Sequence, residues 1–184
     1  MNPIEQLVLG FQDLVAQVPE LVQPFIVVLA GMVPFIEGEG GGAIGIIGGL
    51  NPFVAGIAAA IGNFLAVLGV VTLTARTREA VVARNRNSGT SAGGVATLEA
   101  DRPEPTAKPE SKGRQRFKRW VVRFGVPGAS LLGPAAIPTH FTAAMLVGSG
   151  VSRSWVLLWQ AIAIVLWTIP VTLLVWLGVT ALLG

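Results

Sequence analysis

The chain has no cysteine and a single histidine, His140. Without cysteine there is no disulfide framework and no thiolate ligand for a metal, and one histidine cannot build a multi-histidine site within one chain. We therefore expect no metal and no cofactor. The sequence also offers no pairing of a nucleophile with a base, so we do not expect an enzyme.

Charged residues are also scarce. They make up 12% of the 184 residues, against roughly a quarter in ordinary soluble domains. Hydrophobic residues make up 52%, and the mean hydropathy is +0.68. Such a chain cannot cover itself with polar surface, so the composition predicts an all-α integral membrane protein in contact with the lipid bilayer.

Basic residues are absent before Arg76, and twelve of the thirteen lie between Arg76 and Arg123, beside five acidic residues. This stretch is rich in Ser, Pro, Asn and Thr, a composition that does not bury a core. It predicts a largely disordered linker over residues 76–119. The positive-inside rule places that linker in the cytoplasm and both termini outside. Such a basic linker is more typical of a topology signal than of a nucleic-acid site, so we expect no nucleic-acid partner.

Residues 1–20 carry acidic side chains but no basic n-region, so we expect no cleaved signal peptide. Apolar residues recur at helical spacing from Ile4 to Val18, with polar residues between them. This pattern predicts an amphipathic helix. Two interpretations stay open: the helix lies at the membrane interface, or it packs on the rest of the protein or on a second subunit.

Residues 21–75 form the first predicted membrane half. The apolar segments Pro24–Ile36 and Ala43–Leu50 are both shorter than the about 20 residues needed to cross a bilayer. They flank the polar, glycine-rich break at residues 37–42, which predicts a re-entrant hairpin over residues 21–50. Residues 52–75 are long enough for a transmembrane helix, and we regard Asn63 as the one interruption of this apolar segment.

Residues 120–184 repeat this pattern. A hairpin is predicted over residues 120–151, with its break at residues 133–140, followed by an apolar segment over residues 154–184 that contains Pro170. The last segment is either one kinked helix or two pieces. The predicted fold is thus an inverted repeat of two re-entrant hairpins, each followed by a transmembrane helix. In such repeats, interrupted segments of the two halves meet at a binding site near the bilayer midplane.

The candidate site residues lie at these breaks. Glu37 and Glu39 are acidic residues in an apolar half, and a carboxylate at bilayer depth is costly unless it is paired or protonated. Both are therefore candidate proton carriers, or else solvated acids at the outer interface. His140 is a second candidate for proton coupling, or else an interfacial histidine beside Thr139. The substrate-cavity candidates are Gly40, Gly41, Gly42, Asn63, Arg123, Pro134, Pro138 and Thr139.

Each cavity candidate also has a structural interpretation. The glycines either expose backbone amides to a ligand or permit close helix packing. Asn63 most simply bonds a neighbouring helix, and Arg123 either binds a phosphate or anchors the chain at the cytoplasmic interface. The sequence leaves these alternatives open.

A family resemblance follows from these residues. Pro34, Glu37, Glu39 and Gly42-Ala43-Ile44, then Gly62-Asn63 and the Pro134 to Pro138 break, resemble the small multidrug export family of bacterial membrane proteins. That family is similar in architecture to the DedA group. The resemblance implies a proton-coupled secondary transporter of small amphipathic molecules in the bacterial inner membrane. The alternatives are a DedA-like flippase of polyprenyl-phosphate or another lipid, and a non-transporting scaffold subunit. A chain this small favours a homodimer.

Overall fold

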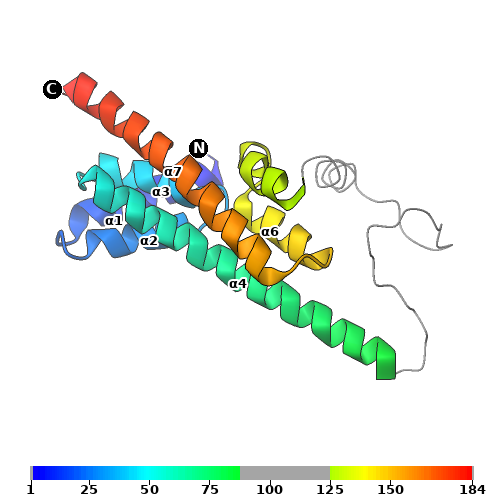
Figure 1. Cartoon of the computed structure of the whole chain (residues 1–184). Coiled ribbons are helices and arrows are strands. Elements are labelled where there is room, and N and C mark those ends of the chain that lie inside the picture. The colour runs from blue at the N-terminus through cyan, green and yellow to red at the C-terminus, as the bar shows by residue number, and fades with distance from the viewer. Residues whose placement is uncertain (1, 88–124, 184) are drawn as a thin grey trace.

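The computed structural model describes residues 2–87 and 125–183, and all regular structure in these ranges is helical. Two long helices run beside each other in opposite directions, and the shorter helices pack around them (Figure 1). The all-helical prediction is confirmed. In chain order, the elements are α1 (Pro3–Gln17), α2 (Gln23–Gly31), α3 (Glu37–Ile47), α4 (Pro52–Asn87), a helical stretch over 125–132, η1 (Gly133–Ala135), α6 (Thr139–Gly148) and α7 (Arg153–Leu183).

Two helices among the described residues, Pro52–Arg84 and Arg153–Leu182, are long and apolar enough to cross a membrane. The most apolar window of α7 is only 22% buried, so α7 is not the buried core helix of a soluble protein. Its outward side chains include Leu158, Leu166 and Leu174, all at least half exposed. Pro170 lies inside one continuous helix, which settles the question of one helix or two in favour of one.

The order of a short helix, a second short helix and a long helix occurs twice in the described residues. The first set is α2, α3 and α4, and the second is the stretch 125–132, α6 and α7. Helix α4 continues to Asn87 and so includes the first twelve residues of the predicted linker, 76–87. The remainder of the predicted linker, residues 88–119, lies outside the described residues.

The first break differs from the prediction. The chain turns between Met32 and Ile36, and the whole glycine-rich segment from Glu37 onward is helical. Phe35 and Glu37 supply the turn with left-handed backbone conformations, at φ values of 73° and 54°. The predicted break at residues 37–42 is therefore wrong in position, because the glycines serve helix packing rather than chain reversal.

The glycines of α3 let other helices approach its backbone. A Cβ atom on Gly41 would lie 3.1 Å from the backbone nitrogen of Gly31 and 3.2 Å from the Ala59 side chain. On another face of α3, a Cβ on Gly42 would lie 2.3 Å from the Thr172 hydroxyl of α7. Of the two interpretations of these glycines, close packing is the one that the structure shows.

Helix α1 packs on the first half. Its N-terminus is closed by a capping box between Asn2 and Glu5, and Val15 on its inner face is fully buried. A Cβ on Gly48, at the end of α3, would lie 2.3 Å from Val15. Other apolar side chains of α1 stay exposed, among them Ile4, Leu7 and Leu14. Packing on the protein is thus confirmed, and these side chains are left free for a membrane interface.

Candidate functional site

The Glu37 carboxylate joins the first half of the chain to the second. Its Oε1 atom accepts hydrogen bonds from the Thr139 backbone N–H at 2.7 Å and from the Thr139 hydroxyl at 2.6 Å. The Nδ1 atom of His140 lies 3.1 Å from the same oxygen. All three residues are buried. The structure therefore brings together Glu37, Thr139 and His140, three of the predicted site residues, from segments about a hundred positions apart.

The first turn of α6 lacks a side-chain cap of its own. Its N-cap residue is Pro138, which makes no capping hydrogen bond, although the first N–H groups of a helix need acceptors. The carboxylate of Glu37 provides one, at the end of the helix where negative charge is favoured by the helix dipole. Glu37 thus caps α6 from the other half of the molecule.

His140 extends the network. With the ring hydrogen on Nδ1, His140 donates a hydrogen bond to the carboxylate of Glu37. The other ring nitrogen, Nε2, is buried and has no hydrogen-bond partner in the described part of the chain. In the neutral ring Nε2 is an acceptor, and in the protonated ring it is a donor. His140 therefore contacts Glu37 through one ring nitrogen, and the other ring nitrogen has no partner among the described residues.

Asn63 of α4 completes the network. The Thr139 hydroxyl lies 3.0 Å from Asn63 Oδ1, but it has one hydrogen, which is already directed at Glu37. Asn63 Nδ2 is buried without a partner. Rotating the amide by 180° resolves both problems, because Nδ2 then donates to the hydroxyl. The result is a chain of hydrogen bonds from Asn63 through Thr139 to Glu37.

The network lies beside the middle of α7 and in the first third of α4. Asn63 is eleven residues from the start of α4 at Pro52, or about 16 Å along the axis. On α7, Thr168 lies against Gly38, the residue after Glu37, and is fifteen residues from either end of the helix, about 22 Å. A bilayer core spanned by these helices would therefore hold Glu37 far from either surface.

The two turns meet at the network. The Phe35 ring, from the turn before α3, packs on the Phe141 ring of α6 with the centroids 6.2 Å apart. A left-handed backbone at a non-glycine residue is costly, on the order of 1 to 3 kcal/mol. Phe35 and Glu37 both adopt it, and this strain accompanies the conformation that directs the carboxylate to α6.

The remaining candidates divide into three groups. Glu39 is half-buried and takes no part in the network. Gly40, like its neighbours Gly41 and Gly42, belongs to helix α3, and Pro134 lies partly buried in η1. Arg123 lies outside the described residues.

Several buried polar residues were not identified from the sequence. Thr168 and Thr172 of α7 are buried, and their hydroxyls have no partner within the described ranges. Gln160, also buried on α7, lies 3.4 Å from the Ser130 hydroxyl. The detectable signal was the spacing of Gln160, Thr168 and Thr172 at eight and four residues, which places polar side chains on one face of an apolar helix.

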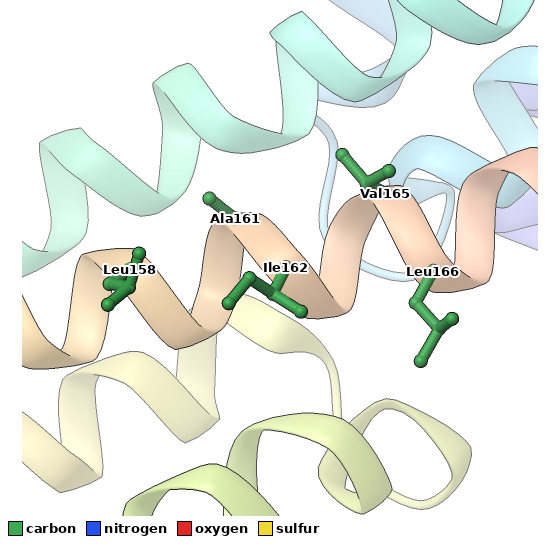
Figure 2. Close-up of a pocket in the computed structure, with 5 residues that line it drawn as sticks. All are labelled: Leu158, Ala161, Ile162, Val165 and Leu166. Carbon is green, nitrogen blue, oxygen red and sulfur yellow. The ribbon is translucent and has the colours of Figure 1, made fainter.

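Two hollows lie outside the network. A shallow groove of about 400 Å³ follows α7 and is lined only by apolar side chains, among them Leu158, Ile162 and Leu166 (Figure 2). A polar cleft of about 500 Å³ lies where α3 ends and α4 begins, and its lining includes Glu20 and Asn51. Neither hollow is lined by Glu37 or His140, so the network is closed in this structure.

Comparison of the chain with models of protein families, with characterised proteins and with solved structures finds no match. The resemblance to the small multidrug export family therefore stays a prediction from the motifs, and the functional argument depends on the geometry of the site.

Proposed function

We propose that this chain is a multi-pass membrane protein that works as a proton-coupled secondary transporter of small amphipathic molecules, with Glu37 as the proton-carrying group. One observation carries the proposal. A buried carboxylate beside the middle of α7 holds the N-terminus of α6 through contacts with the Thr139 N–H, the Thr139 hydroxyl and the His140 ring.

The apolar surface supports the membrane setting. The outward faces of α4 and α7 expose large aliphatic side chains along their whole length, and single soluble domains rarely expose such continuous apolar surface. The beginning of α7 lies beside the end of the apolar part of α4, where Arg153 pairs with Glu79. Under the positive-inside rule this end and the basic linker lie in the cytoplasm, which places both termini outside.

The site supports a mechanism in which protonation loosens the contact between the halves. Hydrogen bonds to a charged group contribute about 1.5 to 3 kcal/mol each, and an anion at a helix N-terminus adds up to about 2 kcal/mol. Protonating Glu37 removes the charge and converts one carboxylate oxygen into a donor. The two turns then separate more easily, and a proton released to the opposite side restores the closed state.

The charges of the site bear on the cargo. Among the described residues, no Lys or Arg side chain contacts the network, and His140 is its only basic member. Phosphate recognition usually relies on several basic side chains or free helix N-termini, and Glu37 already occupies that of α6. The site therefore favours cationic or neutral amphipathic cargo over a polyprenyl-phosphate.

The proposal is tested with the full-length protein reconstituted in liposomes that contain a pH-sensitive dye. We expect an imposed pH gradient to drive uptake of a lipophilic cation such as ethidium, and cation movement to be coupled to proton flux. Glu37→Gln should reduce both by at least about tenfold, because the neutral amide cannot exchange a proton. Glu39→Gln is the matched control and should retain most of the flux.

Two outcomes oppose the proposal. Cation uptake and proton flux that do not exceed those of empty vesicles would rule out this transport activity. Full activity of Glu37→Gln would remove Glu37 from the mechanism. A parallel assay with a labelled polyprenyl-phosphate separates the cargo classes, since lipid movement without cation movement favours the flippase alternative.

A further inference from the structure

Helices α3 and α7 meet along a seam of two glycines and two threonines. A Cβ on Gly38 would lie 2.0 Å from the Thr168 hydroxyl oxygen, and a Cβ on Gly42 would lie 2.3 Å from that of Thr172. In both cases the hydroxyl is the nearest atom, so both hydroxyls are directed at the α3 backbone. The two helices run parallel here, one turn of α3 matching one turn of α7.

The two hydroxyls differ from other helical threonines of this chain. Thr72, Thr77 and Thr180 each donate a hydrogen bond to a backbone carbonyl of the preceding turn, and all three are exposed. Thr168 and Thr172, at 0% and 2% exposure, have no partner within the described ranges. Leaving a buried hydroxyl without a partner is unfavourable, so the closed seam is destabilised at these two points.

The seam also contains a hinge. Pro170 lies between the two threonines and cannot donate the hydrogen bond that would reach the carbonyl of Leu166, which is a recognised cause of helix kinks. Beyond Thr172, the described part of α7 has no buried residue. In Figure 1 this end of α7 extends past the short helices. The part of α7 after Pro170 is therefore held to the rest of the protein mainly by the seam.

We infer that the seam is the route by which water reaches Glu37, and that Thr168 and Thr172 bind water when α7 moves away from α3. The route leads from the α3 C-terminus to Gly38, next to Glu37, on the side of the network away from Arg153. A hydronium ion in the open seam transfers its proton to the Glu37 carboxylate and leaves a water molecule behind. This last step rests on the proposed function, whereas the entry of water does not.

The absence of native cysteine allows a direct test. Thr168→Cys and Thr172→Cys are compared with Ile169→Cys and Leu173→Cys, whose parent side chains are exposed on the outward face of α7. Each full-length variant is reconstituted in liposomes and treated with a charged methanethiosulfonate reagent. This reagent is confined to water and reacts with the thiolate. We expect the two threonine positions to react at least about ten times faster than the controls, and from the side opposite Arg153.

A second pair of variants removes the hydroxyls and keeps the side-chain volume. Replacing an unpaired buried hydroxyl by a methyl group of the same shape is neutral or stabilising. Thr168→Val and Thr172→Val should therefore unfold at an equal or higher denaturant concentration, while proton flux falls at least about fivefold. A purely structural role of the threonines predicts that stability and flux fall together. Thr180→Val, on the same helix, should leave flux unchanged.

The outcomes separate this inference from the proposed function. Equal labelling of all four cysteine positions, or valine variants with undiminished proton flux, overturns the seam as a water route. If the cysteines label as expected but Glu37→Gln transports like the original protein, the water route stands and the role of Glu37 fails. If Glu37→Gln is inactive and the seam cysteines stay unlabelled, Glu37 keeps its role and its protons arrive by another path.

Discussion

The hydrogen bond from the Thr139 hydroxyl to the Glu37 carboxylate spans 2.6 Å between two buried residues of the two halves. Thr139→Val removes this bond together with the contact of the hydroxyl with Asn63, and it leaves the backbone N–H of residue 139 and the His140 ring beside the carboxylate. The change therefore measures how strongly the charge of Glu37 holds α6.

The expected magnitude depends on the charge of Glu37. A hydrogen bond to an ionised group contributes about 1.5 to 3 kcal/mol. Hydrogen bonds between neutral groups of membrane helices average about 0.6 kcal/mol. Thr139→Val also affects the contact with Asn63, so the pair is isolated by a double-mutant cycle that includes Glu37→Ala, which removes the acceptor. We expect a coupling energy of at least about 1.5 kcal/mol where Glu37 is ionised, which is about tenfold in the unfolding equilibrium.

The four proteins of the cycle are unfolded reversibly in mixed micelles at pH 8 and again at a pH low enough to protonate carboxylates. The coupling should fall from at least about 1.5 to about 0.6 kcal/mol between the two conditions. A coupling energy that stays below about 0.6 kcal/mol at pH 8, or that does not change with pH, would refute the idea that the charge of Glu37 holds α6. Thr72→Val is the control, because its exposed hydroxyl bonds only its own helix.

Three further predictions test the wider structure. In denaturant titrations, Gly62→Ala should destabilise the fold by several kcal/mol, because its Cβ would lie 2.0 Å from a backbone carbonyl oxygen of α2. Gly69→Ala, on the same helix, is the control. Its Cβ would meet nothing within 4 Å, so this variant should be neutral or stabilising. Arg153→Ala should cost less than about 1 kcal/mol, and less still in high salt, because its partner Glu79 is exposed. Deleting residues 88–115 should leave cation flux in liposomes unchanged, whereas a scaffold that recruits partners through the linker would lose its function.

The sequence was sufficient to predict the two long helices and four residues of the network. Long apolar segments have few folded alternatives, because the backbone must satisfy its own hydrogen bonds in lipid. Polar residues in such segments are costly and therefore conspicuous, which is how Glu37, Asn63, Thr139 and His140 were identified. The pairing of the breaks of the two halves also followed from the expectation of a repeat, and Glu37 does contact Thr139 and His140.

Two features were not predictable in the same way. Glycine has a low intrinsic helix propensity, so residues 37–42 indicated a break. In the structure they form a helix, because the missing side chains allow α7 and α4 to pack against its backbone. The seam threonines were overlooked because threonine is common in apolar helices and usually bonds its own preceding turn. Only their position against Gly38 and Gly42 shows that this bond is not made.

The dependence of one half on the other follows from a single residue. Pro138 begins α6 without a side-chain acceptor, so the first N–H of that helix must find one elsewhere. With proline there, the acceptor is a carboxylate from the first half. Unlike a hydroxyl or a carbonyl oxygen, a carboxylate loses its charge on binding a proton. If the protein has the proposed function, this loss of charge makes the contact between the two halves depend on pH.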